Sequence, residues 1–271
     1  MARRKRVPVS VLSIAGSDSG GGAGIQADLL TFAAHGVHGT TAIVAVTAQN
    51  SRGVAAIEPL SPRFVRRQLD SVFSDFRPRA VKIGMLLDAP RIRCVAAGLR
   101  RWKAKNVVLD PVMVSKSGAR LLSRAAVGSL KRDLLPLCDL VTPNLPEAEA
   151  LSGIRIRGEG DRRLAARLIA ELGARAVLIK GGHGRGGELR DLLFDGEAFT
   201  VFAAPRIRTR ATHGTGCTLS SAIAANLALG RGLAESVERA TAYLRAGLEK
   251  GCFPGRGLGV PDHFPAAFRS K

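Results

Sequence analysis

The sequence predicts an α/β fold in three layers, with a mostly parallel central sheet and helices on both faces. Short, β-branched apolar runs recur along the chain, and such continuous runs are typical of strands buried on both faces. Amphipathic stretches alternate with these runs over the whole length, which favours strand–helix–strand units. The chain has 271 residues, of which 46% are hydrophobic, enough to bury a full core.

Each element follows from its local pattern. We expect strands at residues 9–15, 41–47, 80–84, 107–110, 140–142, 176–180, 191–194 and 199–203. We expect helices at residues 25–35, 62–76, 91–103, 162–172, 217–229 and 234–250. The turn Asp195-Gly196-Glu197 separates the last two strands and predicts one antiparallel hairpin. In such sheets ligands bind outside the carboxyl ends of the strands, so the loops there are the candidate sites.

The chain shows no internal repeat and no low-complexity linker, so we predict one domain at residues 9–271 after a basic tail at residues 1–8. Arginines and a lysine before the first apolar run give the outline of a signal peptide. We interpret them as a tail, because the apolar run leads directly into a glycine-rich turn. Cleavage near Ala15 would remove the strand that precedes this turn. No run approaches the ~18 apolar residues of a membrane helix, which excludes an integral membrane protein.

The net charge of +19 raises the question of a nucleic-acid partner. Aromatic residues make up only 4% of the chain, and the basic residues are scattered, so we expect no nucleic-acid partner. A basic surface that attracts small anions explains the same charge. The four cysteines have no metal-binding spacing, and reduced thiols in a cytoplasm are the default expectation.

The first candidate site is the segment Gly16-Ser17-Asp18-Ser19-Gly20-Gly21-Gly22-Ala23-Gly24, between the first strand and the first helix. Its five glycines let the backbone approach a ligand closely, although a flexible turn would look alike. It is neither a Walker loop nor a dinucleotide fingerprint. A GxGxxG pattern at Gly182, Gly184 and Gly187 leads into a strand rather than a helix, so we interpret it as a loop.

The second candidate site is Thr212-His213-Gly214-Thr215-Gly216-Cys217-Thr218, which opens a helix of small residues. Unpaired N–H groups at a helix start suit a phosphate or a developing negative charge. Cys217 falls in the first helical turn, where the pKa of a thiol is expected to fall. The alternative is that Cys217 is a small buried apolar residue.

A third group of residues follows the strands at 107–110, 140–142 and 176–180. Asn144 and Glu147 have the spacing of a capping box, which is a complete structural explanation. They also offer an amide and a carboxylate that could hold Mg²⁺ through water, with Asp110 serving the same ion. Lys180 ends its strand and could reach a phosphate.

Two polar residues stand where apolar ones are expected. Gln49 follows a strand, and its amide can pair with the edge of a heteroaromatic ring. Asp28 lies in the first turns of the helix after the glycine-rich loop, where complementing the helix dipole is the alternative explanation.

Seven separated blocks of this sequence resemble the hydroxymethylpyrimidine/phosphomethylpyrimidine kinases of thiamine biosynthesis, in the ribokinase-like superfamily. The blocks are AGSDSGGGAGIQADL (15–29), VTAQNSRGV (46–54), VKIGML (81–86), VVLDPVMVSKSG (107–118), TPNLPEA (142–148), LIKGGH (178–183) and THGTGCTLSSAIAA (212–225). The resemblance implies a ribokinase-like fold. It implies ATP-dependent phosphorylation of 4-amino-5-hydroxymethyl-2-methylpyrimidine, and then of the monophosphate, with Mg²⁺ and in a cytoplasmic homodimer.

The resemblance also implies roles for individual residues. Gly214, Thr215 and Gly216 would form the anion hole for the transferred phosphoryl group, with Cys217 as the base where most of the superfamily has an aspartate. The pyrimidine would be bound by Gln49, Asp28, Met85, Gly16 and Ala23. The nucleotide would be bound by Lys180, Asn144, Thr212 and His213, and the metal by Glu147 and Asp110.

Two departures from the family pattern and two related activities stay open at this point. Residues 208–211 read RTRA, where the family more often has an Asn before the Thr-His pair, and Ala119 stands where an acidic residue is common. Pyridoxal kinase shares the fold and the ATP chemistry, so pyridoxal is the alternative or additional substrate, although Gln49 favours the pyrimidine. A regulatory protein that binds the pyrimidine without turnover is the third possibility, and the intact 214–217 motif argues against it.

Overall fold

The computed structural model describes residues 8–114, 118, 121–123, 125–183 and 187–265. Most of the basic tail lies outside these residues, as do Ala119 and Gly184. Within the described residues, none of the helices combines the length and the apolar character needed to cross a bilayer.

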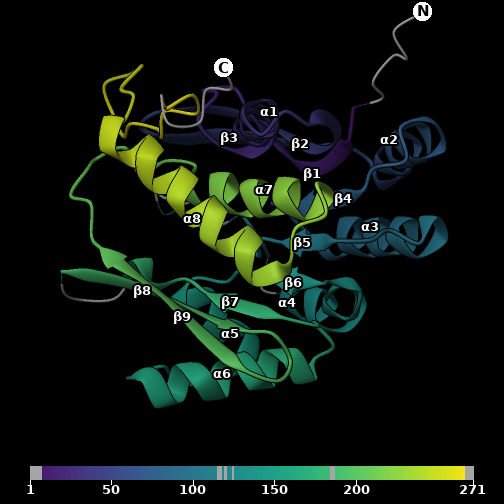
Figure 1. Cartoon of the computed structure of the whole chain (residues 1–271). Coiled ribbons are helices and arrows are strands. Elements are labelled where there is room, and N and C mark those ends of the chain that lie inside the picture. Colours follow the sequence, from purple (N-terminus) through teal and green to yellow (C-terminus); the bar gives the residue numbers. More distant parts are fainter. Residues whose placement is uncertain (1–7, 115–117, 119–120, 124, 184–186, 266–271) are drawn as a thin grey trace, which may run out of the picture.

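One nine-stranded sheet forms the centre of the molecule (Figure 1), in the spatial order β3-β2-β1-β4-β5-β6-β7-β8-β9. The strands are β1 (Ser10–Asp18), β2 (His38–Asn50), β3 (Gly53–Pro59), β4 (Ala80–Ile83), β5 (Val107–Leu109), β6 (Leu140–Val141), β7 (Val177–Ile179), β8 (Glu188–Phe194) and β9 (Phe199–Pro205). Strands β2, β1, β4, β5, β6 and β7 pair in parallel, in agreement with the sequence-based prediction. The β8–β9 hairpin is antiparallel, as its turn predicted.

Helices cover both faces of the sheet, which confirms the α/β prediction. One face packs against α2 (Pro62–Asp75), α3 (Ala89–Trp102), α4 (Ala126–Ser129), α5 (Leu145–Ser152) and α6 (Glu159–Glu171). The other face packs against α1 (Gly24–Ala34), α7 (Thr215–Ala228) and α8 (Leu233–Lys250), and the last two run side by side in Figure 1. Successive strand residues alternate between the two cores: Val11 belongs to the second, while Leu12 and Ile14 belong to the first. This is why the strands read as continuous apolar runs.

The edge strand β3 was not predicted. It pairs antiparallel with β2, and most of its residues are half-buried or exposed. Its sequence GVAAIEP contains small residues and a proline and has no apolar alternation, so the pattern that marks a half-buried strand is missing. Strand β8 also begins earlier than predicted, at Glu188. Its first residues were missed because Glu188 and Arg190 are charged and exposed, which interrupts the apolar run.

Capping residues explain where several helices begin. Ser61 accepts a hydrogen bond from the Phe64 N–H at the start of α2, and Asp88 accepts one from the Arg91 N–H at the start of α3. Helix α7 differs, because it begins after Gly214 at φ 77° and no side chain caps it. Its first N–H groups are therefore available to a ligand.

Candidate active site

The predicted site residues converge at the carboxyl ends of the parallel strands. Asp18 ends β1, Asp110 follows β5, and Lys180 follows β7. Asn144 and Lys180 form a short parallel bridge, so the loops after β6 and β7 lie side by side. The start of α7 meets this edge, because a Cβ on Gly216 would lie 2.9 Å from Asp110 Oδ2 and 3.5 Å from Lys180 Nζ.

The Asp18 carboxylate closes the glycine-rich loop on itself. Its Oδ1 accepts a hydrogen bond from the Gly20 N–H at 2.8 Å, and its Oδ2 accepts from the N–H groups of Gly22 at 3.1 Å and Ala23 at 2.9 Å. Burial raises the pKa of Asp18, but hydrogen bonds from His213 and from the loop N–H groups lower it by more, so that the pKa lies below its ordinary value. The predicted loop is therefore a fixed structure and not a flexible turn.

The glycine-rich loop is packed directly against the segment that precedes α7. A Cβ on Gly214 would lie 1.9 Å from the Gly22 carbonyl oxygen, and a Cβ on Gly22 would lie 2.3 Å from the His213 ring. On the other side, a Cβ on Gly16 would lie 2.3 Å from the Met85 side chain. The approach of Gly214 to the Gly22 backbone requires glycine, and this packing brings the two glycine-rich motifs into one site.

The prediction of a lowered pKa for the Cys217 thiol is wrong for this structure. Burial raises the pKa of Cys217 to about 11; the nearby Lys82 ammonium and the Gly24 N–H oppose this, while the carboxylates of Asp28 and Asp110 add to it. Desolvation and two neighbouring negative charges therefore outweigh the helix terminus. Sequence spacing revealed the helix start but not the carboxylates around it.

Asp28 lies beneath Cys217 in a buried polar network. Its carboxylate accepts hydrogen bonds from Lys82 Nζ at 2.8 and 2.9 Å, from Ser13 Oγ at 2.5 Å and from Ser221 Oγ at 2.7 Å. Asp28 and Lys82 are both 0% exposed. The predicted contact of Asp28 with a substrate stays a prediction.

Lys82 was missed by the sequence analysis. The available signal was a lysine within the four-residue strand Ala80–Ile83, whose other residues are apolar and buried. A charged residue at such a position needs a buried partner of opposite charge, and Asp28 is that partner.

Acidic and basic groups lie close together in the loops after β5, β6 and β7. Lys180 Nζ lies 2.7 Å from Asp110 Oδ1. Asn144 and Glu147 form the predicted capping box, with the Asn144 N–H donating to Glu147 Oε2 at 2.8 Å and the Glu147 N–H donating to Asn144 Oδ1 at 2.9 Å. Burial raises the pKa of Glu147 to about 7, with Lys180 lowering it and Asp110 raising it further. Asn144 and Glu147 therefore cap the helix and also lie beside Lys180 and Asp110.

These groups fit a magnesium ion that arrives with a nucleotide. No cluster of three or more His, Cys, Asp or Glu side chains with metal-binding geometry occurs among the described residues. Mg²⁺ commonly binds through one or two carboxylates, with waters and substrate phosphates filling its other positions. Glu147 and Asp110 supply two carboxylates, and Lys180 supplies a cation for the phosphates.

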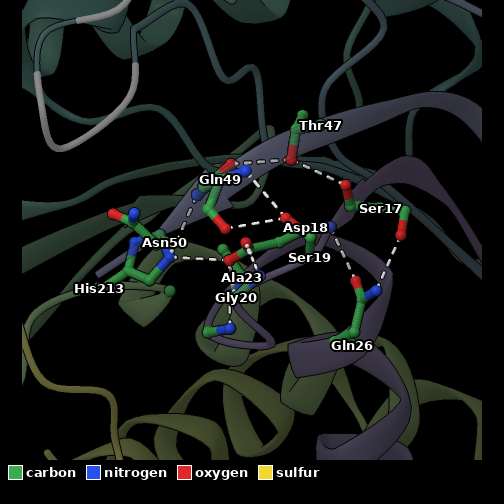
Figure 2. Close-up of polar contacts among 12 residues, drawn as sticks. Ser17, Asp18, Ser19, Gly20, Ala23, Gln26, Thr47, Gln49, Asn50 and His213 are labelled. Carbon is green, nitrogen blue, oxygen red and sulfur yellow. Dashed lines mark hydrogen bonds and ion pairs between the residues drawn. The ribbon is translucent and has the colours of Figure 1, made fainter. Parts of the chain in front are cut away.

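Gln49 and His213 lie together beside the glycine-rich loop (Figure 2). His213 Nε2 is 2.9 Å from Asp18 Oδ2 and 3.3 Å from Gln49 Nε2. The Gln49 backbone is held by Ser19, whose hydroxyl both accepts from the Gln49 N–H and donates to the Gln49 carbonyl at 2.8 Å. His213 was predicted to contact the nucleotide, but its Nε2 is directed toward Asp18 and Gln49. The carbonyl oxygen of the neighbouring Thr212 accepts a hydrogen bond from Thr215 Oγ1.

A hollow of about 640 Å³ opens elsewhere, around residues 77–79 and 103–106 that precede β4 and β5. It lies at the amino-terminal ends of the parallel strands, opposite the edge described above, and contains none of the predicted site residues. The candidate active site is therefore the carboxyl edge, where the helix start, the cations and the glycine-rich loop meet.

Comparison with known proteins identifies the family of this chain. Residues 18–262 match the family model described as phosphomethylpyrimidine kinase. A hydroxymethylpyrimidine/phosphomethylpyrimidine kinase from Rhizobium meliloti is 53% identical over 256 residues, which cover 93% of this chain and 96% of that protein. The thiamine biosynthesis bifunctional protein ThiED from Geobacter sulfurreducens is 52% identical over 95% of this chain, which spans 53% of that protein's length.

Solved structures share the fold. The ADP complex of Bacillus subtilis pyridoxal kinase superposes with a TM-score of 0.89 at 36% identity, covering 96% of this chain and 99% of that one. The fold is therefore ribokinase-like, as the resemblance implied. The family match at residues 18–262 contains the second glycine-rich motif and all but the first two residues of the first. The chain belongs to the phosphomethylpyrimidine kinase family.

Proposed function

We propose that this protein transfers the γ-phosphoryl group of ATP to the hydroxymethyl group of 4-amino-5-hydroxymethyl-2-methylpyrimidine, and then phosphorylates the monophosphate to the diphosphate. The observation that carries this is the packing of Gly214 on Gly22, which places an uncapped helix start next to the loop that holds Gln49. A phosphate-accepting helix terminus and an amide able to read a heteroaromatic edge thus lie in one site.

The residues supply what phosphoryl transfer needs, which is positioning and neutralisation of charge. The N–H groups of Gly214, Thr215 and Gly216 would bind the transferred phosphoryl oxygens, and Lys180 would bind a phosphate of the nucleotide. Asn144 and Glu147, with Asp110, would hold Mg²⁺ through water, and the ion would neutralise phosphate charge when bound. Thr212 would contact the nucleotide beside them.

Cys217 would accept the proton of the substrate hydroxyl in the first step. In the second step the nucleophile is a phosphate that is already anionic, so a base contributes little. Met85, Gly16 and Ala23 would line the pyrimidine pocket around Gln49, with Asp28 beneath Cys217.

Pyridoxal is the second candidate substrate, since a pyridoxal kinase superposes on this chain with a TM-score of 0.89. Mass spectrometry of products formed from ATP and Mg²⁺, with the pyrimidine and pyridoxal offered in parallel, separates the two. We expect the pyrimidine monophosphate to form first and the diphosphate to follow. Formation of pyridoxal phosphate alone would overturn the pyrimidine assignment.

We also propose a homodimer that works in the cytoplasm. Strand β3 is the edge of the sheet, and Val46 on the neighbouring strand β2 is 43% exposed. Proteins usually cover an exposed sheet edge that carries apolar side chains. The four cysteines are all free, which suits a reducing compartment. Sedimentation velocity tests the dimer, and a monomer at micromolar concentration would contradict it.

A further inference from the structure

We propose that Asp18 and His213 fix the orientation of the Gln49 amide, which makes His213 a positioning residue of the pyrimidine pocket. The inference rests on the proposed function, because it concerns how that substrate is recognised. It differs from the sequence-based expectation that His213 contacts the nucleotide. Figure 2 shows the three side chains that carry it, drawn from the end of β1, the end of β2 and the segment before α7.

The proton on His213 is assigned by Asp18. The Asp18 carboxylate is 3% exposed and already accepts three backbone N–H groups, and hydrogen bonding of this kind favours its ionised form. An ionised carboxylate can only accept hydrogen bonds. The 2.9 Å contact between Asp18 Oδ2 and His213 Nε2 therefore requires the hydrogen to be on Nε2.

This assignment constrains the amide of Gln49. A protonated ring nitrogen cannot accept a hydrogen bond, so the amide nitrogen placed 3.3 Å from His213 Nε2 would set a donor against a donor. Rotating the amide by half a turn replaces that nitrogen with Oε1, which can share the Nε2 hydrogen with Asp18. The oxygen and nitrogen of an amide are nearly equal in shape, so the hydrogen-bond network decides between the two orientations.

The other end of the amide agrees with the rotated orientation. Thr47 Oγ1 lies 2.9 Å from the Ser17 carbonyl oxygen, which can only accept, so the single hydroxyl hydrogen goes to Ser17. The Thr47 hydroxyl oxygen, 3.2 Å from the other Gln49 amide atom, is then free to accept. It accepts from the amide NH₂ once the amide is rotated. Hydrogen bonds then run without conflict from Gln49 to Thr47 to Ser17, and from His213 to Asp18 and Gln49.

A fixed amide matters because the substrate presents an ordered pair of groups. An aminopyrimidine offers an amino donor next to a ring-nitrogen acceptor, and an amide meets both only if its oxygen and nitrogen are in the right order. The reversed amide sets donor against donor and acceptor against acceptor, and unpaired polar groups in a partly buried site are costly. Without the His213 hydrogen, only the 3.2 Å contact with Thr47 holds the Gln49 amide in this orientation.

The test is a double-mutant cycle between His213 and Gln49. His213→Ala, Gln49→Ala and the double variant are assayed with KM for the pyrimidine and KM for ATP measured separately. We expect His213→Ala to raise the pyrimidine KM about tenfold, the scale of one hydrogen bond, and to leave the ATP KM within about twofold. In the Gln49→Ala background the same change should raise the pyrimidine KM by less than about twofold, because the effect passes through the amide.

Two further variants separate positioning from general structural damage. His213→Gln places a donor near the position of Nε2 and should recover part of the pyrimidine KM that His213→Ala loses. His38→Ala removes a histidine at the start of β2, far along that strand from Gln49, and should leave both KM values unchanged. Thermal unfolding of every variant shows whether the fold is kept.

The outcomes decide the proposal. A rise in the ATP KM with an unchanged pyrimidine KM would return His213 to the nucleotide side and overturn it. Equal effects of His213→Ala with and without Gln49 would also overturn it. If the wild-type protein fails to phosphorylate the pyrimidine, the proposed function fails, and calorimetric binding of the pyrimidine to wild type and His213→Ala still decides this inference. Absence of wild-type binding would overturn both.

Discussion

At the scale of single residues, the raised pKa of Cys217 defines how it can work. With a pKa of about 11, the thiol is mostly protonated at neutral pH, and the thiolate fraction rises about tenfold per pH unit up to that value. If the thiolate is the base of the first phosphorylation, kcat/KM for the pyrimidine should rise with pH between about 7 and 10. Cys217→Ala should flatten this profile and lower the first step by at least about 100-fold.

The second phosphorylation supplies the control for Cys217. Its nucleophile is anionic, so Cys217→Ala should change that step by no more than about threefold, measured with the monophosphate as substrate. Equal losses in both steps would show that Cys217 acts through the shape of the anion hole rather than as a base.

The ion pair of Asp28 and Lys82 is fully buried beneath helix α7, the helix that carries Cys217. Lys82→Met should lower the free energy of unfolding by about 3–5 kcal/mol, since it leaves the Asp28 charge buried with only two serine hydroxyls as donors. Combining Lys82→Met with Asp28→Asn should cost less than the sum of the single losses, because the second change removes the stranded charge. Additive losses in urea denaturation would contradict this coupling.

At the scale of elements, the first turn of α5 contains both the N-cap residue Asn144 and the carboxylate of Glu147, which is proposed to hold Mg²⁺. Asn144→Ala should remove about 1 kcal/mol of stability by deleting the cap, and should also loosen Glu147. We expect the apparent affinity for Mg²⁺ to fall about tenfold, the effect typical of losing a group that orients a ligand. Ser61→Ala removes the matching cap of α2, which is remote from the site, and should cost similar stability without changing the Mg²⁺ dependence.

Elements also differ in how far the sequence could predict them. The central strands were predictable because burial on both faces leaves a continuous apolar run, whereas β3 was missed because an exposed edge strand needs no such run. The two glycine-rich motifs were recognised from local spacing. The contact between Asp18 and His213 joins residues 195 positions apart, and no local pattern carries that pairing. The lowered pKa expected for Cys217 failed for the same reason, since Asp28 and Asp110 reach it through the fold.

At the scale of the whole molecule, the net charge of +19 concerns association rather than fold. A positive field attracts ATP, which is highly anionic, but has little effect on an uncharged pyrimidine. Ions screen this field over about 10 Å at 0.1 M salt and over about 3 Å at 1 M. We therefore expect kcat/KM for ATP to fall roughly tenfold between low and high salt, while the pyrimidine KM stays within about twofold.

Comparing ATP with the uncharged pyrimidine in the same protein separates this electrostatic effect from other effects of salt. A loss of stability or a general inhibition by salt would lower both kcat/KM values together. A decrease confined to ATP assigns the basic surface to the capture of anions, and the monophosphate, which is charged, should then show a salt dependence between those of ATP and the pyrimidine. Identical salt dependence for all three substrates would mean that the charge serves something other than this reaction.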